Sequence, residues 1–383
     1  MLAIVWLLYA AFGLNMRSIS PVITPIQADL KMTYGEMGMI LGSWQLIYTP
    51  VAIFAGIAMD RWGIRKTLFA GALIMALSEG LRYFATGFFS LAPMVALFGV
   101  GAPFISIGAP KTVSLWFKGD DRATAVGIYT TAPWIGGLFA FGATNSLVMP
   151  LTGYSWRLVF ASYSLLTALF ALTWGLLARD TSSAENSGGA SIAGTFIRLL
   201  KVPNVRIIIL AGLLVLFIDH GFTQWLPKML ENKGISSQAA GFTASIPLIA
   251  AIPAVLLVPR LAVRFPRGRF LASWAILVIV ALVTTATTSS RLLIAGLILY
   301  GFSVPTLLPM LMLTLMNEPE VGAERMGLAG GLFFTIAEIG GFIGPLLMGV
   351  MVDATGAFLA GVLVLAGAGL IFSSLMLLLR GYK

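Results

Sequence analysis

Apolar residues form long stretches along the whole chain, and short charged or turn-rich segments separate them. Each stretch has about 20 residues, the length that an α-helix needs to cross a lipid bilayer. The first stretch lacks the positive flank and small-residue cleavage site of a signal peptide, so we expect it to remain as a span. The pattern predicts an all-α membrane protein with twelve helices, at 2–24, 35–57, 67–85, 92–115, 124–147, 157–178, 205–227, 238–259, 270–288, 292–316, 327–350 and 357–379.

The composition excludes several classes of protein. Residues of the apolar set make up 58% of the 383 residues and charged residues only 10%, whereas soluble proteins carry about 45–50% and 25%. The chain has one histidine and no cysteine, which excludes disulfides and a histidine-rich or thiolate metal site. No glycine-rich lysine loop for ATP is present and the loops leave no room for a catalytic domain, so we expect neither an enzyme nor a bound cofactor.

Basic residues are distributed unequally between the two sets of loops. Sixteen of the 24 Lys and Arg residues fall on the side that holds both termini, six fall on the opposite side, and Arg17 and Lys111 lie inside spans. Positive loops stay in the cytoplasm, so both termini are predicted to be cytoplasmic in a multi-pass protein of the cell membrane. This distribution accounts for the net charge of +9 without nucleic acid as a partner.

A polar linker and an internal repeat divide the chain into two halves. The stretch 179–204 is rich in small polar residues, which is typical of a flexible linker, and separates an N-terminal six-helix bundle (1–178) from a C-terminal one (205–383). The halves resemble each other at an offset of 203 or 204 residues, and such similarity indicates duplication. The matching segments are 56–66 with 259–269, 121–127 with 324–330, and 135–137 with 339–341.

One loop motif carries a family resemblance. The run Gly56-x-x-x-Asp60-Arg61-x-Gly63-x-Arg65-Lys66 resembles the signature of the major facilitator superfamily, and the repeat extends that resemblance over essentially the whole chain. The resemblance implies that two six-helix bundles rock around a site at the membrane midplane, with spans one, four, seven and ten along the pathway. More narrowly, Asn15-Met-Arg17 and Trp225-Leu-Pro227 resemble the cyanate and nitroimidazole permease branch.

The resemblance implies a gating role for the motif. Asp60, Arg61, Arg65 and Lys66 would latch the two halves on the cytoplasmic side, and Arg122 in a later loop is grouped with them. The alternative is that these basic residues only set the topology.

Arg17 is the most informative residue, because it lies in an apolar span. A lone arginine there costs about 2.5–3.5 kcal/mol on insertion scales and needs a partner, a water-filled cavity or a ligand. A guanidinium binds carboxylates and similar planar anions in a bidentate manner. Arg17 is therefore predicted to bind an anion, and the alternative is a permanent salt bridge to Asp219 or Glu338.

Polar groups of the second half complete the predicted site. The repeat offset makes His220 equivalent to Arg17, and Gln224 lies on the same helical face at i, i+4. We predict that His220 and Gln224 flank the anion, and that Asp219, Glu338 or His220 carries coupling protons. Glu338 could instead neutralise Arg17.

Other residues inside the spans have simpler interpretations. Glu79 and Arg82, three residues apart, are predicted to form an ion pair, and Lys111 is expected to extend its amine to the membrane surface. Aromatic side chains at mid-depth could line a small ligand, although packing between helices is their default role; the candidates are Trp44, Tyr48 and Trp134.

Together these features predict a monomeric, proton-coupled symporter of a small organic or inorganic anion in the lipid bilayer, working by alternating access. Two alternatives remain open. One is an exporter of amphipathic drugs or cations in which Asp219 and Glu338 supply the counter-charges. The other is a membrane receptor that transports nothing.

Overall fold

The computed structural model describes residues 1–179, 198–262 and 264–379, and within these ranges every regular element is a helix. The predicted all-helical fold is confirmed. Of the predicted linker, residues 180–197 lie outside the described part, so the proposed boundary between two bundles stays a prediction.

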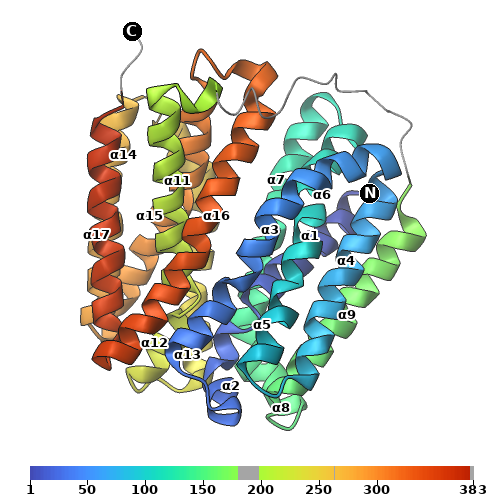
Figure 1. Ribbon diagram of the computed structural model, residues 1–383, viewed down its shortest axis with the longest axis vertical. Helices are drawn as coiled ribbons and strands as arrows, with labels where there is room; N and C mark the ends of the chain where they lie inside the picture. Colours follow the sequence, from blue (N-terminus) through green and yellow to red (C-terminus); the bar gives the residue numbers. More distant parts are fainter. Residues whose placement is uncertain (180–197, 263, 380–383) are drawn as a thin grey trace. The chain divides into compact units, whose positions relative to one another are not determined.

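The chain divides into two compact units (Figure 1), unit 1 with Met1–Glu185 and Leu226–Ser245, and unit 2 with Asn186–Trp225 and Ile246–Lys383. The helices of unit 1 are α1 (Leu2–Arg17), α2 (Ile23–Leu30), α3 (Tyr34–Trp62), α4 (Ile64–Leu81), α5 (Phe88–Ala96), α6 (Phe98–Trp116), α7 (Gly119–Ala143), α8 (Met149–Leu151), α9 (Trp156–Leu177) and α12 (Leu226–Asn232). The helices of unit 2 are α11 (Pro203–Thr223), α14 (Arg267–Thr287), α15 (Ser290–Met316), α16 (Gly322–Thr355) and α17 (Phe358–Leu377). Helix α13 (Ser237–Ala262) begins in unit 1 and ends in unit 2.

Among the described residues, ten helical segments are long and apolar enough to cross a membrane, and the bent helix α3 makes an eleventh if it is counted as one span. The one predicted span that is missing from this count, 67–85, corresponds to α4. Its 18 residues include Arg65, Lys66 and Glu79, and these three charges lower its apolar character.

The first span is broken rather than continuous. Helix α1 ends at Arg17, a 3-10 turn with a proline follows at Ser20–Val22, and α2 continues to Leu30. The segment Leu2–Leu30 is 29 residues long, so Arg17 lies near its middle, directly before the break. The segment is therefore longer than the predicted stretch 2–24, and its α-helical hydrogen bonding is interrupted at the 3-10 turn, because proline cannot continue the hydrogen-bond ladder of a helix.

The two units repeat one packing arrangement. In unit 1 the most extensive helix pair is α1 with α7, and in unit 2 it is α11 with α16, which are spans one and five and spans seven and eleven of the predicted repeat. Glycines allow both approaches: a Cβ atom on Gly136 would overlap the carbonyl oxygen of Ala10, and one on Gly340 would overlap that of Leu213. Small residues at a contact let the backbones of membrane helices approach closely.

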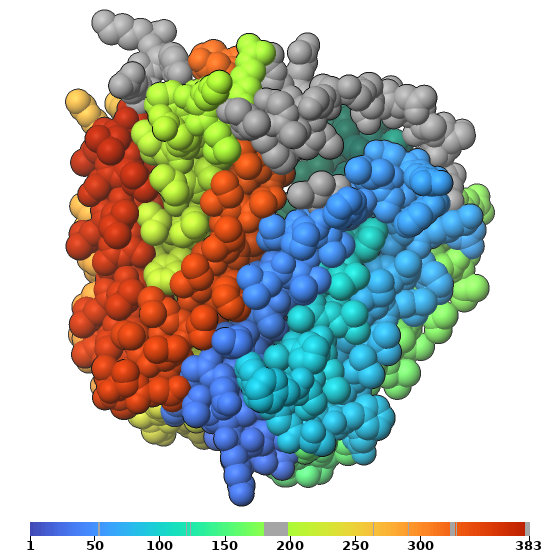
Figure 2. All heavy atoms as spheres, in the orientation of Figure 1, coloured from blue at the N-terminus to red at the C-terminus, as the bar shows by residue number. Residues whose placement is uncertain are grey.

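Side chains fill the space between neighbouring helices of unit 2. Figure 2 shows α11 packed between α16 and α17 on the visible face, and α11 contacts both along its length. Helix α16 ends at Gly356, whose φ of 74° is the left-handed conformation that commonly terminates helices at glycine.

The glycine contact in α16 predicts a stability difference. Gly340→Ala should destabilise the protein by roughly 1–3 kcal/mol, because its methyl group has no room against α11. Gly331→Ala in the same helix is the matched control, since open space surrounds that position. Thermal unfolding in detergent, followed by size-exclusion chromatography, measures the difference; equal midpoints for the two variants would contradict the packing argument.

Candidate functional site

Arg17 is held against α7 in unit 1. Its side chain is 8% exposed, and its guanidinium carbon lies 5.8 Å from the centre of the Trp134 ring. Gly137 leaves room beside it, because a Cβ atom there would lie 2.9 Å from Cδ and 3.2 Å from Nη1 of Arg17. Cation–π contacts with tryptophan are stronger where the cation is desolvated. The structure thus brings together Arg17 and Trp134, two of the predicted site residues.

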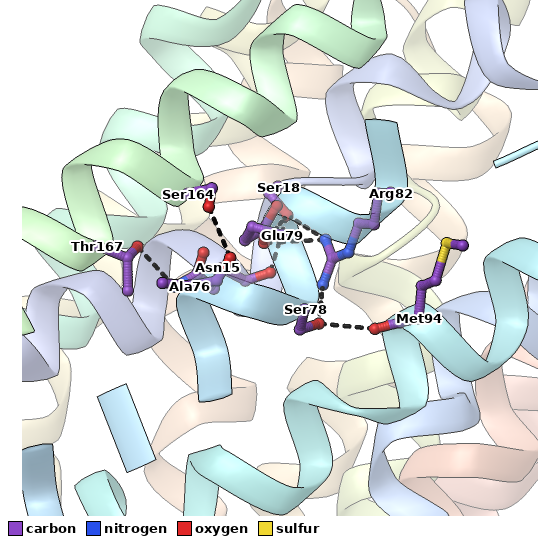
Figure 3. Close-up of polar contacts among 9 residues, drawn as sticks. All are labelled: Asn15, Ser18, Ala76, Ser78, Glu79, Arg82, Met94, Ser164 and Thr167. Atoms are coloured by element: carbon purple, nitrogen blue, oxygen red, sulfur yellow. Dashed lines mark hydrogen bonds and ion pairs between the residues drawn. The ribbon is translucent and has the colours of Figure 1, made fainter. Parts of the chain in front are cut away.

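A buried polar cluster lies beside the end of α1 (Figure 3). The predicted ion pair between Glu79 and Arg82 is confirmed, with Arg82 Nη1 2.9 Å from Glu79 Oε1. Ser18, the residue after Arg17, donates to Glu79 Oε1 at 2.8 Å and accepts from Arg82 Nη1 at 3.0 Å. The break in the first span therefore contacts this ion pair directly, through Ser18.

Trp44 and Tyr48 belong to an aromatic row in the core of unit 1. Their rings meet edge to face at 5.8 Å, and Trp44 contacts Phe98 at 5.3 Å in the same way. The hydroxyl of Tyr48 lies 2.9 Å from that of Ser106 on α6. These contacts are helix packing, the default interpretation of both aromatics, and their role in substrate binding stays a prediction.

Two carboxyl groups lie on neighbouring helices of unit 2. Asp219 Oδ1 accepts hydrogen bonds from Thr223 on the next turn of α11 and from Tyr300 of α15, each at 3.2 Å. Glu338 of α16 is 8% exposed, and its Oε2 has no hydrogen-bond partner among the described residues. Asp219 and Glu338 belong to α11 and α16, the most extensively contacting helix pair of unit 2. This pair of acids can hold a proton or face a cation.

His220 and Gln224 lie at the end of α11, where the Gln224 backbone N–H donates to the His220 carbonyl at 3.2 Å. Gln224 is buried and His220 partly buried. They share unit 2 with Asp219 and Glu338, and their part in binding an anion stays a prediction.

The predicted gating residues have contacts within unit 1. Asp60 forms an ion pair with Lys111 of α6, and both side chains are partly exposed. The Arg65 guanidinium donates to the carbonyl of Gly175 near the end of α9, at 2.6 and 3.1 Å. Arg61, Lys66 and Arg122 are exposed. Lys111 therefore extends to a specific acid, and the latch itself stays a prediction.

Several polar residues were not predicted from the sequence. Thr223 is four residues after Asp219, and helical spacing could have indicated it. Ser18 and Tyr300 could not be predicted in this way, because the acids that they contact come from other helices. Within the described part of the chain, no group of three or more His, Asp or Glu residues could hold a metal ion.

Comparison with known proteins agrees with this architecture. Residues 5–345 match the sequence model described as Major Facilitator Superfamily. The hexuronate transporter of Bacillus subtilis is 26% identical over 98% of this chain and 93% of its own length. The D-galactonate transporter of Escherichia coli is 25% identical over 86% and 84%. A mutant of the nucleoside transporter NupG has a crystal structure that matches with a TM-score of 0.82 and 16% identity, over 98% of both chains.

The helical fold and these relatives define a multi-pass membrane transporter of small molecules, not an enzyme. The chain belongs to the Major Facilitator Superfamily, as its loop motif predicted. Neither relative named above is a cyanate or nitroimidazole permease, and the narrower resemblance stays a prediction.

Proposed function

We propose that the protein is a symporter that moves a small organic acid, of the sugar-acid class, together with protons. The two six-helix halves predicted from the sequence would rock around the site, with both termini in the cytoplasm.

The observation that carries this proposal is the position of Arg17. A permanently charged guanidinium lies near the middle of a 29-residue apolar span, 5.8 Å from the centre of the Trp134 ring in a cation–π contact. Intramembrane charged groups are costly, and they commonly mark a substrate pathway. The fork of N–H donors on a guanidinium matches the two oxygens of a carboxylate. From the sequence repeat, His220 and Gln224 are proposed as further ligands of the anion, and Trp44 and Tyr48 as residues that line its path.

The relatives support the substrate class. Two proteins that match nearly the whole chain are named as transporters of hexuronate and of D-galactonate, which are both sugar carboxylates. A hydroxylated carboxylate needs one cationic group and several neutral hydrogen-bonding groups, and the predicted site residues supply both kinds.

Proton coupling is assigned to the two acids of unit 2. Transfer of an ionised carboxylate into an apolar environment is costly, and uptake of a proton removes that cost. Glu338 has a buried oxygen without a hydrogen-bond partner among the described residues, and Asp219 lies on the neighbouring helix α11. A proton held by this pair would enter with the anion and reduce the charge that crosses the membrane.

The loop residues would control access to the site. Asp60, Arg61, Arg65 and Lys66 would form the cytoplasmic latch together with Arg122. Asp60 is already paired with Lys111, and a partly exposed ion pair contributes only about 0–1 kcal/mol, so it can exchange partners during the cycle.

Transport in proteoliposomes tests the proposal. The purified protein should accumulate radiolabelled D-glucuronate or D-galactonate when the outside is made acidic, and a protonophore should abolish the accumulation. Liposomes without protein are the control. Absence of uptake for every sugar acid offered, by protein that is folded and inserted, would reject this function.

Export of amphipathic cations is the second candidate, because Asp219 and Glu338 also provide two acidic side chains on neighbouring helices of unit 2. Competition distinguishes the two functions. If the protein is a sugar-acid symporter, unlabelled sugar acids should block uptake of the labelled substrate. If it exports amphipathic cations, lipophilic cations should block transport instead. A receptor without transport activity would show neither.

A further inference from the structure

The ion pair in unit 1 has no part in the transport proposal, although it lies beside the break that follows Arg17. Glu79 lies in the last turn of α4 and Arg82 directly after the helix ends at Leu81, and their side chains are 0% and 1% exposed. The Arg82 guanidinium also lies over the ring of Phe160, 5.2 Å from its centre. Burying two charges is costly, and apolar residues of similar size often stabilise a protein equally well. The stability of the fold alone therefore does not account for this pair.

The pair is joined to α1 by one hydroxyl group. Ser18 Oγ lies 2.8 Å from Glu79 Oε1, 3.0 Å from Arg82 Nη1 and 2.9 Å from the carbonyl oxygen of Asn15 (Figure 3). The Ser18 backbone N–H reaches only Asn15, at 3.4 Å, where the regular ladder of α1 stops. Three polar contacts thus hold the Ser18 side chain at the point where the backbone leaves the helix.

Further contacts fix the same turn to neighbouring helices. The Asn15 amide donates to Thr167 Oγ1 of α9 at 3.1 Å. Arg82 Nη2 donates to Ser78 at 3.2 Å, and Ser78 donates at 2.7 Å to the carbonyl of Met94 on α5. The last turn of α1 is therefore held by α4 and α9, and the ion pair is itself held by α5.

The geometry links this anchor to Arg17. Consecutive helical residues project about 100° apart, so Ser18 and Arg17 point to different sides of the same turn. Ser18 is bound to α4, whereas the Arg17 guanidinium lies against Trp134 of α7. Fixing Ser18 therefore orients Arg17. Because the charges of the ion pair cancel, it does this without adding net charge beside Arg17.

We propose that Glu79 and Arg82, acting through Ser18, are positioning residues that aim the Arg17 guanidinium at the transported anion. This inference rests on the proposed function, since the anion is the ligand of Arg17. The ion pair contacts the Ser18 hydroxyl and is not itself proposed to bind the ligand. Its loss is therefore expected to weaken binding while the transport cycle continues.

The first experiment removes the hydroxyl link and keeps the ion pair. Ser18→Ala should raise KM for the sugar acid about tenfold, because a small misorientation of a binding group has a large effect, with little change in maximal rate. Ser18→Thr, which keeps the hydroxyl, should restore KM. Ser43→Ala is the matched control, since Ser43 is also buried but its hydroxyl faces backbone carbonyls, those of Ile40 at 2.8 Å and Ala92 at 3.4 Å, rather than the ion pair.

The second experiment removes the charges. Glu79→Gln alone leaves a buried unpaired arginine and is expected to misfold, so the test uses Glu79→Met with Arg82→Met. This double variant should unfold at a temperature similar to wild type and show the same tenfold rise in KM. A purely structural role for the pair predicts an unchanged KM in the folded double variant.

A third measurement needs no substrate. The chain contains no cysteine, so Arg17→Cys introduces a single thiol. Its rate of reaction with a charged methanethiosulfonate reagent should change by about fivefold or more when Ser18→Ala is added, because side-chain orientation controls access. Ser43→Ala in the same background should leave the rate unchanged.

The outcomes separate the two proposals. Unchanged KM and unchanged thiol reactivity in folded Ser18→Ala and double methionine variants would overturn the positioning role. If wild-type protein transports no sugar acid but the thiol rate still depends on Ser18, the proposed function fails and the orientation of residue 17 by this cluster is upheld.

Discussion

Arg17→Lys is expected to lower the uptake efficiency for a sugar acid by about a hundredfold, as is typical when one member of a buried charge pair loses its geometry. Lysine keeps the positive charge, but its ammonium is a point charge that cannot bind both oxygens of a carboxylate in a planar fork. It also loses the extended contact with the Trp134 ring. Initial rates of uptake into proteoliposomes, over a range of substrate concentrations, measure the effect.

Arg157→Lys is the matched control for this variant. Arg157 also belongs to unit 1 and also lies over a tryptophan, Trp156, at 4.2 Å, but it forms an ion pair with Asp29 outside the predicted site. The Arg157→Lys variant should transport the sugar acid like wild type. Normal KM and maximal rate in Arg17→Lys would show that Arg17 does not bind the anion, provided that the variant elutes as a folded monodisperse species.

Most of the fold could be predicted from hydropathy, because a bilayer allows few ways of satisfying the backbone. Each of the twelve apolar stretches corresponds to helix within the described residues. Loop charge and repeat spacing led to the correct family. The ends of helices were less predictable: α16 runs from Gly322 to Thr355, well beyond the predicted 327–350, since its polar ends continue the helix outside the apolar stretch.

Predictions of the site succeeded where the interaction is local in sequence. Glu79 and Arg82 are three residues apart, and helical geometry alone indicates their ion pair. The contact of Arg17 with Trp134 joins residues 117 positions apart, and that of Asp219 with Tyr300 joins residues 81 apart. Such contacts depend on which helix faces pack together, which a single sequence does not specify.

The break after Arg17 could not be predicted from the sequence for the same reason. Hydropathy predicts one continuous helix over 2–24, because Ser18 and Ser20 are only isolated polar residues in an apolar stretch. In the structure Ser18 contacts an ion pair at the end of α4, formed by residues 61 and 64 positions away. The role of a polar residue inside a span thus depends on its partner on another helix.

Glu338→Gln is expected to abolish proton-driven accumulation of the sugar acid while exchange of labelled for unlabelled substrate continues. Glutamine keeps the size of the side chain but cannot gain or lose a proton at neutral pH. Exchange needs only the loaded carrier to move back and forth, whereas accumulation needs a group that releases its proton on the other side. The measurement compares the two assays on the same proteoliposomes.

Asp353→Asn in the same helix is the matched control, because Asp353 is exposed near the end of α16 and should leave both activities intact. The hydrogen bonds of the two acids indicate that Glu338, rather than Asp219, binds the proton. Its Oε2 has no hydrogen-bond partner among the described residues, whereas Asp219 accepts two hydrogen bonds from hydroxyl groups. A proton that binds to this pair therefore gains most at Glu338. Accumulation that persists in Glu338→Gln and is lost in Asp219→Asn would assign the coupling proton to Asp219 instead, and persistence in both would remove it from this pair of acids.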